Sequence, residues 1–246
     1  MKITVFNGSP RADNGNTHIM VGEFLKGAAQ AGADTENIFL AANTIKPCRG
    51  CFGCWLKTPG KCVIKDDMAG LLEKFIGSDI VVFATPLYVD NVTGIMKNFM
   101  DRLIPLVDPH FDKDKGGECV HKSRFDKTAG IVVISNCGFP EQSHFQVLEL
   151  LFKRIARNMR SEIIGQIFRG GGAILKDTPL ILKLAVHRYK KLLQNAGREI
   201  VENGCLSPQT KEKLERPLVS DQRYISSANQ YFDKLQTTSI KKVAAL

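Results

Sequence analysis

The chain has 246 residues, 43% of them apolar and 24% charged, which is enough to build one large domain around a full core. No apolar stretch reaches the length of a membrane span, and residues 1–6 are too short for a signal-peptide core, so we expect a cytoplasmic protein without a membrane partner. The net charge of +9 comes from scattered basic residues with no nucleic-acid motif, so no nucleic-acid partner is expected.

The first two thirds of the chain predict alternating strands and helices. Apolar runs typical of buried strands occur at 2–6, 35–40, 79–84, 129–135 and 162–168. Helical spacing of apolar residues predicts crossovers that begin near residue 16 and after residues 66–67, and that cover 94–106 and 143–159. This alternation predicts a doubly wound parallel sheet with helices on both faces.

The remainder of the chain, residues 169–246, has a helical pattern. A long amphipathic stretch covers 180–201, and two shorter helical pieces are indicated near 214 and at 224–235. These segments have too few apolar residues for a core of their own. We therefore interpret 169–246 as a helical extension of the domain formed by 1–168, packed on the sheet or on a second subunit.

Ligands of such sheets bind beyond the carboxyl ends of the strands, so the loops after Phe6, Ala84 and Ser135 are informative. The first of these loops, residues 7–17, combines hydroxyls, an arginine and backbone N–H groups at a helix N-terminus, which predicts an anion site. It lacks the Gly-Lys-Ser/Thr ending of a P-loop and is no dinucleotide fingerprint. The plain alternative is an ordinary capped turn.

The second and third loops carry groups that suit a flat ring. Pro86, Leu87, Tyr88 and Val89 form an apolar and aromatic stretch that predicts one wall. The third loop, residues 136–139, contributes Asn136 and Gly138 on the opposite side of the ring. The alternative is a proline-bearing strand exit with Tyr88 packed on a neighbouring helix.

Together these loops resemble those of the NADPH-dependent FMN reductase family. Gly8-Ser9-Pro10-Arg11 with Gly15-Asn16-Thr17 is similar to its phosphate loop, and 85–88 with 96–102 is similar to its second flavin segment. The resemblance covers about residues 1–168 and implies a flavodoxin-like fold with strand order 2-1-3-4-5, bound FMN, and a homodimer or homotetramer. It also implies roles for individual residues: the phosphate is held by Ser9, Arg11, Asn16 and Thr17, and the isoalloxazine is lined by Pro86, Leu87, Tyr88 and Val89.

A cysteine-rich insert at 48–62 carries Cys48, Cys51, Cys54 and Cys62. Four closely spaced thiols suit an iron–sulfur cluster or tetrahedral zinc. The spacing resembles the iron-sulfur flavoprotein branch of the same family, which implies a [4Fe-4S] cluster on these four residues. Zinc, and free or redox-active thiols, remain open alternatives.

The expected function is an FMN-dependent oxidoreductase that moves electrons from NAD(P)H or a protein donor to a small-molecule or protein acceptor. The flavin carries the chemistry, so no catalytic side chain is predicted, and the isolated histidines are not expected to act as bases. One alternative is an iron-sulfur flavoprotein that carries electrons without a substrate of its own. Another is a zinc-stapled fold with vestigial flavin loops.

Overall fold

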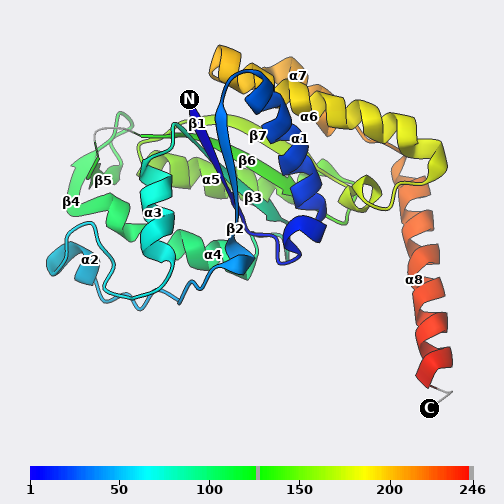
Figure 1. Cartoon of the computed structure of the whole chain (residues 1–246), viewed down its shortest axis with the longest axis horizontal. Helices are drawn as coiled ribbons and strands as arrows, with labels where there is room; N and C mark the ends of the chain where they lie inside the picture. Colours follow the sequence, from blue (N-terminus) through cyan, green and yellow to red (C-terminus); the bar gives the residue numbers. More distant parts are fainter. Residues whose placement is uncertain (126–127, 244–246) are drawn as a thin grey trace.

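A parallel sheet of five strands forms the centre of this computed structural model, which describes residues 1–125 and 128–243 (Figure 1). The strands are β1 (Lys2–Asn7), β2 (Asp34–Phe39), β3 (Ile80–Pro86), β6 (Gly130–Asn136) and β7 (Ile163–Arg169), hydrogen-bonded in the order β2-β1-β3-β6-β7. The near-continuous apolar runs of β1, β3 and β6 are buried, as expected of strands that helices cover on both sides.

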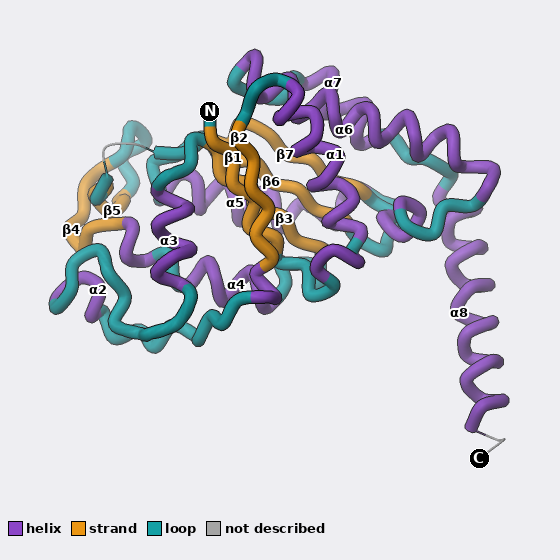
Figure 2. Tube along the Cα trace, viewed as in Figure 1, coloured by secondary structure: helices purple, strands orange, loops and turns teal. Residues whose placement is uncertain are grey.

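Helices cover both faces of this sheet (Figures 1 and 2). One face packs against α1 (Asn16–Gln30) and α6 (Lys183–Asn203), and the other against α3 (Met68–Ile76), α4 (Gly94–Asp101) and α5 (Gln146–Asn158). Successive strand residues supply the two cores alternately: Ile3 and Val5 belong to the first and Phe6 to the second. The predicted flavodoxin-like fold class is confirmed.

The strand order agrees with the predicted order 2-1-3-4-5 except for the numbering. The fourth and fifth strands of the sheet are labelled β6 and β7, because the labels β4 and β5 belong to a separate antiparallel hairpin. This hairpin, β4 (Val107–Lys113) and β5 (Cys119–Ser123), was not predicted, because its residues are mostly exposed and show no apolar alternation. The helix expected to end near residue 106 ends at Asp101 instead. A short 3-10 turn follows over Ile104–Leu106, where Pro105 cannot continue an α-helix.

The helical extension packs against the helix that follows the first loop. A Cβ on Gly27 of α1 would lie 1.8 Å from the carbonyl oxygen of Gln194, and one on Gly197 of α6 would lie 2.0 Å from that of Phe24. The two helices therefore touch backbone to backbone, which only glycine permits. Residues of α6 and α7 (Pro208–Glu215) belong to the same core as residues of α1 and the sheet, and so hold α1 in place.

The last described helix, α8 (Asp221–Val243), leaves the body of the molecule (Figure 1). Its first turn is held by Tyr224, whose ring lies 3.0 Å from where a Cβ on Gly171 would be. Beyond that turn its apolar side chains are exposed: Ile225, Tyr231, Phe232 and Leu235. Within the described residues, none of the helices is long and apolar enough to span a bilayer. Residues 244–246, the end of the predicted extension, lie outside the described residues.

Candidate functional site

The three loops singled out in the sequence meet at the carboxyl edge of the sheet. The backbone N–H of Gly8 donates to the carbonyl of Ala84 (2.7 Å), and the hydroxyl of Thr93 donates to the carbonyl of Gly8 (2.7 Å). Asn136 Nδ2 donates to the hydroxyl of Thr17 (2.8 Å), which joins the third loop to α1. These hydrogen bonds bring the ends of β1, β3 and β6 into one site.

The first loop presents the N-terminus of α1 to this edge. Gly15 precedes the helix in an extended conformation, and among the described side chains none caps it. Ser9 is buried, and it lies close to Gly15: a Cβ on Gly15 would be 2.6 Å from Ser9 Oγ. The Ser9 hydroxyl also accepts a 3.3 Å hydrogen bond from the Arg11 backbone N–H, while the Arg11 residue is exposed. An uncapped helix N-terminus beside a serine and an arginine can bind an anion.

Three buried polar atoms at this edge have no hydrogen-bond partner within the described part of the chain. They are Asn7 Nδ2, Asn16 Oδ1 and Ser135 Oγ. Buried polar groups in proteins are nearly always hydrogen-bonded, so three such atoms at the ends of β1 and β6 and the start of α1 indicate a site shaped for a polar ligand. This arrangement fits a phosphate-bearing cofactor such as FMN.

The second loop forms a tight, strained turn at the same edge. Tyr88 and Asn91 exchange two backbone hydrogen bonds (2.9 and 3.1 Å), and Val89 and Asp90 between them have φ of 50° and 54°. Left-handed backbone is unfavourable for a β-branched residue, and such strain is concentrated at functional sites. Val89 is 99% exposed. The turn therefore offers apolar surface to a ligand and leaves it uncovered by the described protein.

The third loop follows β6 and is tied to the second. Asn136 is buried and its carbonyl accepts from the Leu87 N–H (2.8 Å), whereas Gly138 is exposed. The ring of His144 lies 3.5 Å from the carboxylate of Asp90 in the second loop, and 3.5 Å from the carboxylate of Glu141. Asp90 is distant from this histidine along the chain, whereas Glu141 is only three residues before it and could have been found from the sequence.

The cysteine-rich insert lies apart from these loops, around α2 (Gly53–Leu56). Cys48 and Cys51 are exposed, Cys54 is buried and Cys62 is half-buried. Burial raises the pKa of the Cys54 thiol, and the nearby Cys62, Cys48 and Cys51 raise that pKa further. The donor chemistry of four neighbouring thiols fits a cluster. The described residues nevertheless form no group of three or more metal-binding side chains, so the ligand set stays a prediction.

A buried arginine holds the two ends of this insert together. The sequence did not indicate this contact. Arg102, 1% exposed, donates from Nη1 to the carbonyl of Lys46 (2.6 Å) and forms two hydrogen bonds with the Asp66 carboxylate (2.7 and 3.0 Å). Its Nη2 also lies 3.4 Å from Cys62 Sγ. Burial would raise the pKa of Asp66, but hydrogen bonds from Arg102 and from backbone N–H groups outweigh it and lower that pKa. Arg102 thus joins both ends of the insert to α4.

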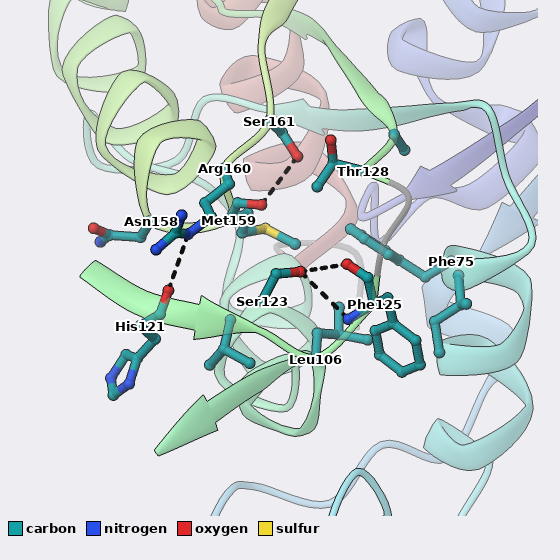
Figure 3. A pocket seen from close by; sticks show the side chains of 13 residues that line it. Phe75, Leu106, His121, Ser123, Phe125, Thr128, Asn158, Met159, Arg160 and Ser161 are labelled. Atoms are coloured by element: carbon teal, nitrogen blue, oxygen red, sulfur yellow. Dashed lines mark hydrogen bonds between the residues drawn. The ribbon is translucent and has the colours of Figure 1, made fainter. Parts of the chain in front are cut away.

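A hollow at the other end of the sheet is shown in Figure 3. It is lined by side chains that include Phe75, Leu106, His121 and Met159. Ala129 and Ser161, which also line it, lie just before β6 and β7, at the amino ends of the strands. Ligands of parallel sheets bind at the opposite end, so this hollow is not the candidate site.

The order of the sheet and the placement of its loops define a flavodoxin-like α/β protein. Comparison with known families identifies the family within this class. The model of the NADPH-dependent FMN reductase family matches residues 1–152, and the chain belongs to that family.

Individual relatives fall into two kinds. An iron-sulfur flavoprotein of Methanocaldococcus jannaschii is 41% identical over 106 residues, 43% of this chain and 53% of that protein. A putative NAD(P)H-dependent FMN-containing oxidoreductase of Bacillus subtilis is 28% identical over 178 residues, 72% of this chain and 91% of the relative. The chain thus spans only about half the length of the iron-sulfur flavoprotein that it matches.

The fold is also similar to solved structures. A FMN-dependent NADH-azoreductase from Bacillus anthracis, in complex with FMN, superposes with a TM-score of 0.60 at 16% identity, over 81% of this chain and 99% of that one. A NAD(P)H:quinone oxidoreductase from Methanothermobacter marburgensis gives a TM-score of 0.57 at 12% identity, over 81% and 96% of the two chains. At these identities the likeness concerns the fold alone.

Proposed function

We propose that the chain binds FMN at the carboxyl edge of its sheet and acts as an NAD(P)H-dependent flavin oxidoreductase. The observation that carries the proposal is the uncapped N-terminus of α1 at the same edge of the sheet as three unpartnered buried polar atoms. Family membership and the FMN-containing relative add support. Bound FMN would supply hydride acceptance from NAD(P)H and onward electron transfer.

The residues of this chain bind and orient the cofactor. The N–H groups of the first turn of α1, with Ser9, Arg11, Asn16 and Thr17, hold the phosphate. Pro86, Leu87, Tyr88 and Val89 cover one side of the ring system, and Asn136 and Gly138 lie on the other side. Thr93 keeps the first two loops together through its hydrogen bond to Gly8.

This function is tested by identifying the cofactor and measuring turnover in the same preparation. Heat-denatured holoprotein is expected to release FMN rather than FAD, because a single anion site serves one phosphate. The holoprotein should then oxidise NADPH or NADH with ferricyanide as acceptor. Release of FAD contradicts the assignment of the cofactor. Bound FMN without any nicotinamide oxidation favours the electron-carrier alternative.

A second candidate function, electron carriage through an iron-sulfur flavoprotein, is favoured by the four-cysteine insert and by the name of the 41% identical relative. In this proposal Cys48, Cys51, Cys54 and Cys62 ligate a [4Fe-4S] cluster, which would supply one-electron transfer.

All seven cysteines are unpaired, which suits a reducing compartment such as the cytoplasm.

We expect a homodimer or larger assembly, because α8 carries an apolar stripe that its own body does not cover. Ile225, Ala228, Phe232 and Leu235 recur at alternating three- and four-residue spacing, the pattern of a helix that packs on another helix. Light scattering of the full chain should give at least twice the monomer mass of 27.2 kDa. A monomer at every concentration up to about 100 µM, where subunits of ordinary affinity associate, contradicts this expectation.

A further inference from the structure

We propose that Lys176, which lies beyond the part of the chain that the family model matches, is a further residue of the FMN phosphate site; this inference rests on the proposed function. The ammonium of Lys176 donates a 2.9 Å hydrogen bond to the carbonyl oxygen of Asn14. Asn14 belongs to the first loop and lies just before the start of α1. The two residues are 162 positions apart, so the fold brings this cation to the phosphate loop.

The segment that carries Lys176 is fixed on the third loop where the chain leaves β7. The N–H of Gly171 donates to the carbonyl of Phe139 (2.7 Å), and the N–H of Gly172 donates to the carbonyl of Cys137 (2.9 Å). A Cβ on Gly172 would lie 2.9 Å from the side chain of Asn136, so a larger residue would displace that side chain. The glycines therefore let the chain pass directly over the third loop.

The next turn places the lysine beside α1. A short 3-10 turn covers Gly172–Leu175, and Leu175 is 2% exposed in the core that also contains residues of α1. On the other side of Lys176, the hydroxyl of Thr178 donates to the carbonyl of Ile174 (2.7 Å) and closes the turn. With anchors on both sides, the backbone at Lys176 is held within reach of the first loop.

This position is electrostatically unfavourable for a cation until an anion binds. The N-terminus of a helix carries a partial positive charge, which attracts anions and repels cations. At α1 that charge is not reduced by a side-chain cap from Gly15. Within residues 1–125 and 128–243, Lys176 pairs with no carboxylate, whereas the exposed Lys97 pairs with Asp101 (2.5 Å). An anion at the start of α1 would stabilise both the helix and the lysine.

The charge of a flavin phosphate matches this arrangement. A phosphate monoester carries about −1.5 to −2 charges at pH 7. Arg11 is the single cation among the residues that the sequence assigns to the phosphate, and Lys176 supplies a second one. The acid of the first loop, Asp13, is exposed and accepts a 2.9 Å hydrogen bond from the side chain of Asn14. Two cations therefore balance the charge of one phosphate.

A buried amide gives an independent sign that a ligand belongs here. Asn7 is 0% exposed, and its Oδ1 accepts a 3.0 Å hydrogen bond from the N–H of Ser9. The Nδ2 of the same amide has no partner within the described part of the chain. A buried donor next to the serine of the phosphate loop needs an acceptor, and a phosphate oxygen is one.

The test measures the affinity of the full-length apoprotein for FMN at about 0.1 and about 1 M NaCl, where the Debye length is ~10 and ~3 Å. At the lower salt, Lys176→Gln should bind FMN about tenfold more weakly, and Lys176→Glu at least about fiftyfold more weakly. The loss in Lys176→Glu should shrink at least about threefold at the higher salt. Lys176→Arg should stay within about threefold of wild type, because it keeps the charge and can donate to a phosphate.

A control on α1 and a stability measurement separate a phosphate contact from a structural role. Lys26 is exposed and lies ten residues after Asn16, about 15 Å along the helix, so Lys26→Glu should bind FMN within about twofold of wild type. The apoprotein of Lys176→Gln should have a Tm within about 2 °C of wild type, since no buried contact is lost.

Two results would overturn the role of Lys176. One is wild-type affinity in both Lys176→Gln and Lys176→Glu. The other is an equal, salt-independent loss in these two variants with a Tm lowered by more than about 5 °C, which assigns the lysine to structure alone. Failure of the proposed function gives a different result: the wild-type apoprotein does not bind FMN, or Arg11→Ala and Ser9→Ala bind it as tightly as wild type does.

Discussion

Replacing Arg102 by methionine is expected to lower the free energy of unfolding by about 3–5 kcal/mol. The Arg102 and Asp66 side chains are 1% and 0% exposed, so the substitution leaves a carboxylate buried without its cation. It also removes the donor to the Lys46 carbonyl and to Cys62, which join the two ends of the insert to α4. The unfolding midpoint in urea, read by far-ultraviolet circular dichroism, measures the loss.

A matched control is available on α4, the helix that ends just before Arg102. Lys97 forms an ion pair with Asp101 whose side chains are 56% and 48% exposed, and Lys97→Met should cost less than about 1 kcal/mol. Equal small losses in Arg102→Met and Lys97→Met would contradict the role of the buried pair. Lysine at position 102 should restore only part of the stability, because an ammonium cannot make the two-point contact with Asp66.

The same ion pair predicts a pH dependence. The pKa of Asp66 is lowered in the folded chain, so its contribution is fully present above the ordinary carboxyl pKa of about 3.9. That contribution is lost as the pH falls from there through the lowered folded value. Asp66→Asn should therefore be less stable than wild type at neutral pH, and the difference should shrink below about pH 4.

Changing Cys62 to serine is expected to abolish cluster binding. Anaerobically purified wild type should contain about four iron and four acid-labile sulfide per chain, as a [4Fe-4S] cluster requires. The loss in Cys62→Ser should be nearly complete, because a hydroxyl is a poor ligand for these irons. Cys205→Ser, which changes an exposed cysteine outside the insert, serves as the control. Iron near zero in wild type after reconstitution, or full iron in Cys62→Ser, refutes the cluster.

The parallel sheet was predictable because local patterns specify it. Buried strands such as 79–84 read as unbroken apolar runs, and the helices between them show regular apolar spacing. The β4–β5 hairpin was not predictable in this way. Its strand Val107–Lys113 contains Pro109 and three charged residues, a composition that does not indicate a strand. The strand forms by pairing with the antiparallel strand β5, and this pairing cannot be seen in the local sequence pattern.

The same distinction applies to the candidate site: its loops could be predicted from local sequence, but the contacts between them could not. Loops 7–17 and 85–94 stand out in the sequence because glycine, proline and hydroxyl residues follow buried strands. The contacts that join them do not stand out, because Asn136 and Thr17 are 119 residues apart, and Arg102 and Asp66 are 36 apart. Thr93 was the exception that could have been found, since a threonine just before a helix is a recognised capping signal, and its hydroxyl accepts from the Met96 N–H.

The most direct test of the account is the affinity of the apoprotein for FMN when the first loop is changed. Charge-assisted and hydroxyl contacts to phosphate contribute roughly 1.5–3 kcal/mol each, so Arg11→Ala and Ser9→Ala should each weaken FMN binding about ten- to a hundredfold. Arg188→Ala, which removes an exposed arginine on α6, should leave the affinity unchanged. Wild-type affinity in both Arg11→Ala and Ser9→Ala would contradict the assignment of the phosphate to this loop.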